Sequence, residues 1–226
     1  MGLKVAIVGF APSSRLLAPF GNSQWEIWGL NDGYHDLPRW DRWFQLHSPR
    51  IISGSVRDRN HWDWLKAQTK PIYMREALPE VPASVRYPLE DITAQFGRYF
   101  TNSISWMIAL AIHEGAEDIG IYGVDMATGS EYGDQRPSCE YFLGLALGTG
   151  IRIHVPPQSE LLKAGFLYGF EDEKQDAFTA KMRARLEEIG SRLDFNKAGI
   201  SKLEQERHFL MGARENMQYV LRNWTP

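Results

Sequence analysis

The chain contains a single cysteine, Cys139, among its 226 residues. One cysteine can form neither an internal disulfide nor a cysteine-based zinc site, and such sparse usage fits a reducing compartment. Histidine pairs with the HxxxH or HExxH spacing are absent too. The sequence therefore predicts no metal site, and no cofactor is required by any motif in it.

Long apolar segments are missing as well. No apolar run reaches about 18 residues, the length that a membrane-spanning helix needs. The chain opens on a strand pattern and not on the charged and apolar regions of a signal peptide. We therefore expect a cytoplasmic protein without membrane contacts.

The chain also lacks a large excess of positive or negative charge, since its formal net charge is only −3. Such a balance provides no general attraction for nucleic acid, although nucleic acid is not excluded as an acceptor substrate. The hydrophobic content of 43% is close to that of globular proteins, so a sizeable core can form.

Two common phosphate-binding motifs, G-x-G-x-x-G and the lysine-containing P-loop, do not occur. Their absence argues against a dehydrogenase and against a P-loop kinase. In their place, an apolar run at 3–9 ends in the turn Gly9 to Ser14. Within this turn, Gly9 permits a tight bend and Ala11 a close approach. We expect Ser13 and Ser14 to cap a short helix, beside N–H groups that favour a phosphate.

Short apolar runs bounded by turn residues predict six strands, at 3–9, 25–30, 41–46, 71–74, 118–124 and 151–155. Helical patterns fall at 58–68, at 104–113 and at 137–147, the last with Pro137 in its first turn. Strands that alternate with helices predict an α/β fold, a doubly wound and mostly parallel Rossmann-like sheet. The proline-rich stretch 77–88 is expected to be a surface loop and a candidate lid.

The C-terminal part has a different texture, without strand signals and rich in Glu, Lys, Arg, Ala and Leu. Apolar residues recur every three or four positions from Phe178 to Leu193, and every seven at Leu203, Leu210, Met217 and Trp224. We expect two amphipathic helices that form a hairpin turning near 196–199. Residues 1–168 are thus predicted to form the Rossmann-like domain and 169–226 a helical hairpin, which favours a homo-oligomer held by these helices.

Eight tryptophans are many for this length, and most of them lie between Trp25 and Trp64. They are compatible with a bulky aromatic core beneath the sheet, or with a platform on which a base or a sugar ring stacks.

Candidate site residues follow from a rule for open parallel sheets, which bind ligands beyond the carboxyl ends of their strands. The segments that reach this edge supply polar or small residues for nucleotide contacts: Gly9, Ala11, Ser13, Ser14, Asn31, Asp32, Thr101, Asn102 and Ser103. Each group also has a purely structural interpretation as a turn or a helix cap.

Five further residues are candidates for chemistry or for charge neutralisation at the same edge. Asp125 follows an apolar strand and is the candidate functional carboxylate, while His35 and His47 are candidate bases because histidine titrates near neutral pH. In the segment 131–137, Tyr132 and Arg136 could hold a phosphate or carboxylate.

Three segments, VAIVGFAPSS, WGLND and TNSISWMIALAIHEGAEDIGIYGVDM, resemble in order parts of bacterial sialyltransferases that use a CMP-activated sugar, and of related MptE-like proteins. The resemblance implies nucleotide contacts at 11–14, at Asn31 and at 101–103, and transfer without a metal. The chain departs from those enzymes in two respects: Tyr122 does not align with their tyrosine pair, and no histidine lies between Asp125 and His154. The whole chain, including QRPSCEYFLGLA, also resembles uncharacterised tailed-phage proteins.

Three functions remain open at this point. The chain could be a metal-independent glycosyltransferase, with a nucleotide sugar over the first turn. It could instead bind or sequester a nucleotide for a phage without catalysis. Finally, it could be a virion or assembly accessory protein whose Rossmann core is vestigial.

Overall fold

The computed structural model describes residues 2–48, 60–126, 130–164, 167–171 and 175–224; the side chains at 130–132 and 175–181 are outside this description. The chain divides into two compact units, Met1–Lys163 and Ala164–Pro226.

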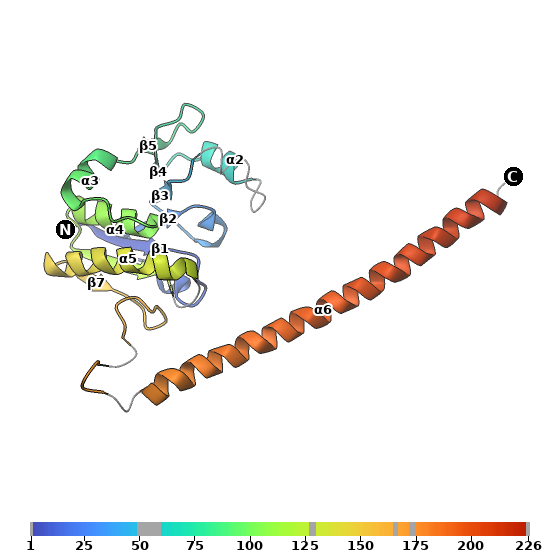
Figure 1. Cartoon of the computed structure of the whole chain (residues 1–226). Helices are drawn as coiled ribbons and strands as arrows, with labels where there is room; N and C mark the ends of the chain where they lie inside the picture. The colour runs from blue at the N-terminus through green and yellow to red at the C-terminus, as the bar shows by residue number, and fades with distance from the viewer. Residues whose placement is uncertain (1, 49–59, 127–129, 165–166, 172–174, 225–226) are drawn as a thin grey trace. The chain divides into compact units, whose positions relative to one another are not determined.

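The first unit is built on a seven-stranded sheet in which every neighbouring pair is parallel (Figure 1). The order is β5-β4-β3-β2-β1-β6-β7. The strands are β1 (Lys4–Val8), β2 (Glu26–Leu30), β3 (Arg42–Gln45), β4 (Ile72–Met74), β5 (Ser84–Arg86), β6 (Asp118–Tyr122) and β7 (Arg152–His154). The predicted doubly wound, Rossmann-like α/β sheet is therefore confirmed.

The central strand β1 is apolar on both sides because it is covered on both faces of the sheet. Val5 and Ile7 belong to the larger core cluster, whereas Ala6 and Val8 alternate with them and belong to a smaller cluster on the opposite face. All four side chains are buried. This explains why the sequence shows a continuous apolar run at this strand and no alternation.

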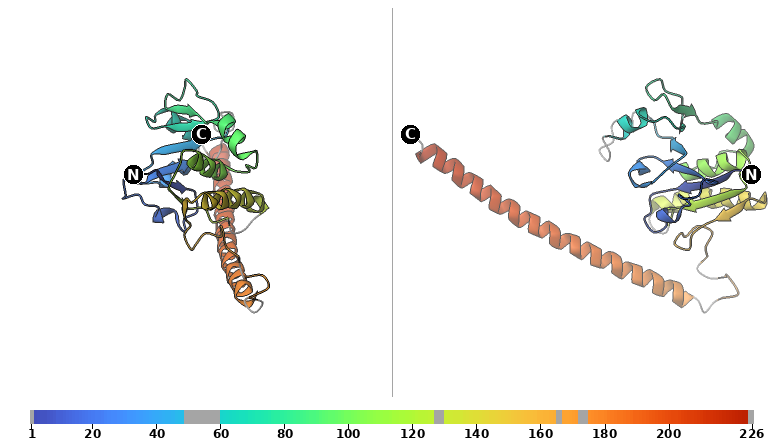
Figure 2. Two further views of the ribbon diagram at one scale, coloured as in Figure 1. Left: turned by 90° about the vertical axis from the view of Figure 1, so that its left-hand side faces the viewer. Right: turned by 180° about the vertical axis from the view of Figure 1, so that it is seen from behind.

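One face of the sheet carries three helices, α3 (Leu89–Phe96), α4 (Ser103–His113) and α5 (Ser130–Gly148). Figures 1 and 2 show α4 and α5 side by side on that face. The start of α4 is fixed by its N-cap, because Asn102 Oδ1 accepts a hydrogen bond from the Ser105 amide at 2.9 Å. Helices α4 and α5 both begin near the carboxyl ends of the strands and run back along the sheet. Their first turns therefore lie at the carboxyl edge of the sheet.

The other face is covered by shorter elements, namely η1 (Arg15–Leu17), η2 (Gly33–Asp36) and α2 (His61–Lys66). Large aromatic side chains compensate for the lack of long helices. Trp43 is fully buried against Leu65 and Ile72, and Trp40, Trp62 and Trp64 pack around this cluster. Trp28 is fully buried on the α4 face. For Trp28 and Trp43 the core interpretation is therefore the right one.

Several element boundaries differ from the sequence predictions. The stretch 77–88, expected to be a loop, contains β5, which pairs with β4 through Tyr73 and Val85. Helix α5 begins seven residues before Pro137, which lies inside it at the cost of one intrahelical hydrogen bond. In the short helix expected after Ser14, Leu16 and Leu17 are exposed, because η1 is a single short turn with no buried residue.

The second unit is dominated by one helix, α6 (Gln175–Trp224), of 50 residues. The predicted hairpin turn near 196–199 is wrong, since the helix continues through it. No proline interrupts this segment, and Asn196 and Gly199 each cost only about 1 kcal/mol or less in a helix interior. Within the described part of the chain, no helix is long and apolar enough to cross a membrane.

The amino ends of β6 and β7 are joined by a buried carboxylate. Asp118, at the start of β6, accepts hydrogen bonds from the Arg152 guanidinium at 2.6 and 2.8 Å and lies 2.9 Å from His154 Nε2. Lys4 of β1 approaches the same carboxylate at 3.6 Å. The Arg152 guanidinium, together with His154 and Lys4, holds the pKa of Asp118 well below its ordinary value.

We predict that Asp118→Asn destabilises the first unit by about 1–3 kcal/mol at pH 7, because Arg152 and His154 lose an ionised acceptor. The pKa of this carboxyl is lower in the folded chain than in the unfolded one, where it is about 3.9. Its contribution is therefore complete above about pH 5 and is lost as the pH falls through the folded value. The difference between wild type and variant should narrow below about pH 4.

Urea unfolding followed by tryptophan fluorescence measures this difference at each pH. Asp63→Asn is the matched control, because Asp63 is exposed and its ion pair with Lys66, three residues along the same helix, lies at the surface. That control should change the free energy of unfolding by less than about 0.5 kcal/mol. A gap between wild type and Asp118→Asn that stays constant from pH 7 to pH 3 would contradict the assignment.

Candidate functional site

The strand order reverses between β1 and β6, since β2 to β5 extend to one side of β1 and β6 and β7 to the other. This switch point is where open α/β sheets bind ligands, beyond the carboxyl ends of the strands. At this point the two chain segments are joined by backbone hydrogen bonds of 2.8 Å, from Gly9 N to the Tyr122 carbonyl and from Ala11 N to the Gly123 carbonyl.

Two glycines allow the two segments to come this close. A Cβ on Gly9 would lie 2.5 Å from the Gly123 carbonyl oxygen, and a Cβ on Gly123 would lie 2.6 Å from that of Gly9. Gly123 also has a φ of +63°, in the left-handed region that favours glycine. Neither position accepts a side chain without movement of the backbone.

The serines of the first turn connect it to the end of β6. The Ser13 hydroxyl donates to the Asp125 carboxylate, with 2.7 Å to each oxygen. The Ser14 hydroxyl is buried and accepts from the Gly123 amide at 2.9 Å. The prediction that these serines cap a helix is wrong, because η1 has no side-chain cap hydrogen bond. They fasten two strand ends instead.

Asn31 ends β2 in a strained conformation, with a φ of 50°. Its backbone is held on both sides, since its amide donates to the Phe44 carbonyl and its carbonyl accepts from Trp43 Nε1. Its side-chain oxygen Oδ1 is buried and has no hydrogen-bond partner among the described residues. Asp32 follows as the residue before η2, so the Asn-Asp-Gly segment is a turn as well as a candidate site.

Arg15 connects the loops after β1 and β2. Its Nη1 donates to the Asp36 carboxylate at 2.8 Å and to the Phe10 carbonyl at 3.2 Å. Its Nε is buried and, within the described chain, has no hydrogen-bond partner. The Phe10 ring lies over Gly33, where a Cβ would be 3.2 Å away. Sequence reasoning missed Arg15, although a cation one residue after the Ser13-Ser14 pair was a readable signal.

The start of α4 reaches the same edge but is joined to α5. Thr101 Oγ1 lies 2.7 Å from Ser138 Oγ, and Asn102 Nδ2 donates to the Gln135 carbonyl at 2.9 Å. The buried Cys139 thiol donates to Asn102 Oδ1 at 3.3 Å, and burial raises its pKa to about 12. The predicted polar group Thr101, Asn102 and Ser103 is therefore largely committed to holding two helices together.

The remaining candidates are more scattered. His35 lies on η2 and His47 lies two residues beyond β3, and both are exposed. Tyr132 and Arg136 belong to α5 and not to a loop, and the side chain of Tyr132 is outside the described part. Arg136 is engaged by Glu140 at 2.8 Å and by the Lys163 carbonyl at 3.0 Å.

A shallow hollow of about 430 Å³ lies beside the switch point, on the η1 face of β6 and β7. It is lined by Leu17, Tyr122, Ile153, His154, Val155, Pro156 and Pro157. Among the described residues, no group of three or more His, Cys, Asp or Glu side chains could hold a metal ion.

No family model matches this chain, and no curated protein matches it either. Among solved structures, the chain is similar to the sialyltransferase CstII from Campylobacter jejuni in complex with the substrate analogue CMP-3FNeuAc. The identity is 15%, the match covers 69% of this chain and 81% of that one, and the TM-score is 0.46. An alpha-2,3-sialyltransferase from the same organism matches at 16% identity over 68% of this chain and 75% of that one, with a TM-score of 0.41.

Three alanine substitutions separate the two reasons for glycine at the switch point. Gly115→Ala introduces only strain, because Gly115 ends α4 with a φ of +75° and no atom lies within 4 Å of the place of a Cβ. Gly9→Ala introduces only overlap, and Gly123→Ala introduces both. We predict that Gly115→Ala costs about 1–2 kcal/mol and that Gly123→Ala costs at least about 3 kcal/mol. The free energy of unfolding in urea measures each cost, and equal costs at Gly115 and Gly123 would refute the close approach of β1 and β6.

Proposed function

We propose that the chain binds a nucleotide or a nucleotide sugar at the carboxyl edge of the sheet, where the segments after β1, β2 and β6 meet. The observation that carries this proposal is a pair of buried polar atoms without partners in the described chain, the acceptor Asn31 Oδ1 and the donor Arg15 Nε. Buried polar groups in native proteins are nearly always satisfied by protein, water or ligand. Both atoms belong to loops at the ligand-binding edge of the fold.

The chemistry of the two atoms suits the two halves of a nucleotide. A guanidinium N–H is a strong donor to phosphate, and Arg15 supplies the cation that the first turn lacks as a P-loop lysine. An amide oxygen accepts from a base amino group or a ribose hydroxyl. The Asn31 backbone is also fixed by its hydrogen bonds to β3, so little backbone entropy is lost when this residue binds a ligand.

Asp125 has a different role in this proposal. A carboxylate repels phosphate, so the Ser13-Asp125 pair is a poor place for the phosphate itself. It is a good acceptor for a sugar hydroxyl, with lone pairs left over after the Ser13 hydroxyl has donated. In this proposal Gly9 and Ala11 would form the floor of the site, with Asp32 beside Asn31, and residues 101–103 with Arg136 would form its α4–α5 side.

Glycosyl transfer is the activity that this ligand would support. His35 or His47 would remove the proton of the acceptor hydroxyl as its oxygen bonds to the anomeric carbon, while Asp125 orients the donor sugar. The bond from that carbon to the phosphate oxygen breaks, and the nucleotide leaves as an anion beside Arg15. Two alternatives remain, a nucleotide-binding protein without catalysis and a phage accessory protein with a vestigial core. The three outcomes are separated by whether ligand binds and whether it turns over.

The binding prediction uses a variant that keeps the fold. Asn31→Gly removes the amide oxygen but suits the positive φ, so the variant should be as stable as wild type. Isothermal titration with CMP, UMP, AMP, GMP and their sugar conjugates should give at least one micromolar ligand for wild type. We expect Asn31→Gly to weaken that ligand about tenfold or more, and Arg15→Gln likewise.

Arg39→Gln is the matched control for Arg15→Gln. Arg39 also joins loops through a carboxylate and several carbonyls, but it does so beside Trp25, at the amino end of β2. It should lower stability without changing the Kd. Absence of binding across the whole panel would reject the proposal and favour a vestigial core.

The catalytic prediction concerns the two exposed histidines, whose replacement by alanine should leave the fold intact. If the chain is a transferase, His35→Ala or His47→Ala should lower the release of free nucleotide from the bound nucleotide sugar at least about a hundredfold, with little change in Kd. Chromatography of the products measures this release. Binding without any turnover in wild type would favour the non-catalytic binder, and turnover unchanged in both variants would exclude both bases.

A further inference from the structure

Helix α6 carries an apolar stripe along its whole length. In a heptad notation with Leu186 at a, the a and d positions from 182 to 224 are Met182, Leu186, Ile189, Leu193, Asn196, Ile200, Leu203, Arg207, Leu210, Arg214, Met217, Leu221 and Trp224. All the large apolar members beyond Met182 are exposed. Six successive heptads of this kind are the signature of a two-stranded coiled coil, and an exposed apolar stripe of this extent marks an interaction surface.

The length of α6 argues for a partner of similar length. At 1.5 Å per residue, the 50 residues of the helix span about 75 Å. A compact unit the size of the first one has a diameter of about 40 Å. A globular unit of that size can cover about half of the stripe at most, whereas a second copy of α6 can cover all of it.

The polar residues in the stripe decide how two copies pair. In a parallel pair in register, each a residue faces its own copy, so Arg207 would face the partner's Arg207 and Arg214 the partner's Arg214. At the flanks, Arg192 would also lie beside the partner's Lys197. These like-charged contacts oppose the parallel arrangement.

An antiparallel pair removes these conflicts in one register. With Ile200 opposite the partner's Leu203, the helices overlap from residue 179 to residue 224, and Leu193 faces the partner's Leu210. Arg207 then faces the partner's Asn196, to which it can hydrogen-bond, and Arg214 faces the partner's Ile189 instead of another arginine. At the flank, Lys197 lies beside the partner's Glu204, twice by symmetry, and no flanking pair has like charges.

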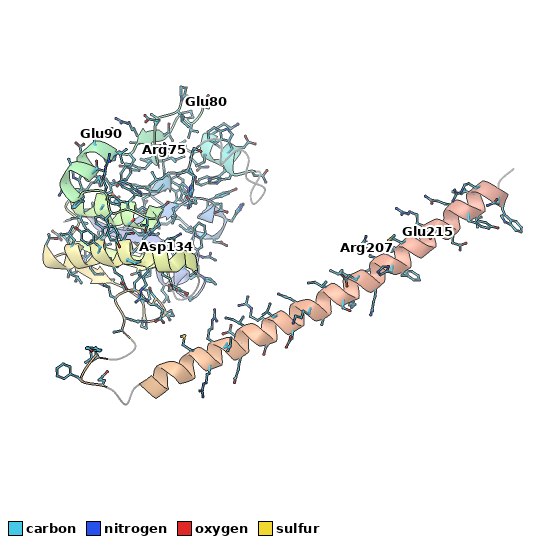
Figure 3. All side chains as sticks on the ribbon, viewed as in Figure 1. Arg75, Glu80, Glu90, Asp134, Arg207 and Glu215 are labelled. Atoms are coloured by element: carbon cyan, nitrogen blue, oxygen red, sulfur yellow. The ribbon has the colours of Figure 1, made fainter. Side chains whose placement is uncertain are left out.

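The surface of α6 has a hollow that fits this register. It is lined by Leu203, Glu206, Arg207, Leu210, Met211 and Arg214, and Arg207 is labelled in Figure 3. Residues 203, 206, 207 and 210 occupy successive d, g, a and d positions, the four corners of a coiled-coil hole. In the antiparallel register the side chain that enters this hole as a knob is the partner's Asn196. Its amide can hydrogen-bond to the guanidinium of Arg207 at the edge of the hole.

We propose that α6 pairs with α6 of a second copy of this chain as an antiparallel coiled coil, with Asn196 of each helix opposite Arg207 of the other. The pairing uses only the second unit, so it is independent of ligand binding by the first.

Disulfide trapping in the full-length chain tests the orientation. Asn196→Cys and Arg207→Cys chains, carrying different tags, are co-expressed and oxidised with diamide. The antiparallel pair should yield disulfides between the two different variants and none when either variant is present alone. Disulfides between two chains of the same variant would demonstrate the parallel arrangement and overturn the proposal. The native Cys139 does not interfere, because it is buried and its pKa is raised to about 12.

Light scattering after size exclusion tests the surface. Leu210 and Tyr219 are equally exposed in the single chain, at 58% each, but Leu210 lies in the stripe and Tyr219 on the opposite side. Wild type and Tyr219→Glu should have twice the chain mass, and Leu210→Glu the mass of one chain. A wild-type chain of single mass at 50 μM, or a Tyr219→Glu variant that dissociates like Leu210→Glu, would overturn the proposal.

Discussion

The close approach of two backbones at the switch point is the constraint on which the first unit depends. Gly9 and Gly123 bring the ends of β1 and β6 to a distance that no side chain permits. The hydrogen bonds of Ala11, Ser13 and Ser14 to residues 123–125 can form only because of that approach. The turn after β1 is therefore shaped by β6, a strand more than 100 residues away in the sequence, and not by its own helix. The proposed ligand site is built on this junction.

The apolar side chains on the two faces of the sheet are buried by different kinds of element. The α4–α5 face uses long apolar helices, whose side chains form the larger core cluster with Val5, Ile7 and Trp28. Among the described residues, the opposite face carries only the short elements η1, η2 and α2, and bulky rings such as Trp43 and Trp64 pack beside them. The tryptophans thus fill space that long helices fill on the α4–α5 face. This packing leaves the loops after β1 and β2 free to be shaped by contacts such as the Arg15–Asp36 ion pair.

The fold could be predicted from the sequence because it rests on local patterns. Apolar runs closed by glycine or proline marked six of the seven strands, and the Asn102 cap marked the start of α4. What failed depended on distant partners. From the local sequence Ser13 and Ser14 are typical helix caps. Their hydrogen bonds to Asp125 and Gly123 form only because the end of β6 lies beside them. Strand β5 has three residues and is defined by its pairing with β4. Nor does any local pattern show that Arg15 Nε and Asn31 Oδ1 are left without partners.

For the C-terminal helix, the local sequence contained the information, but the prediction of a hairpin was wrong. Its heptad spacing runs unbroken from Met182 through Asn196 to Trp224, and that continuity already argued for a single helix. A glycine and an asparagine close together suggested a turn, although both cost little in a long helix. The lesson is that the phase of an apolar repeat across a suspected turn is a stronger indication than the turn residues themselves.

The two outer strands, β5 and β7, have only three residues each. An open sheet exposes unpaired N–H and C=O groups along its outermost strands, which are templates for edge-to-edge aggregation. Here both borders are short, and each carries an arginine in an ion pair, Arg86 with Glu90 and Arg152 with Asp118. A foreign strand would find few backbone groups to pair with and would have to displace a charge. The sheet can thus be seven strands wide without recruiting further copies of itself into a growing ribbon.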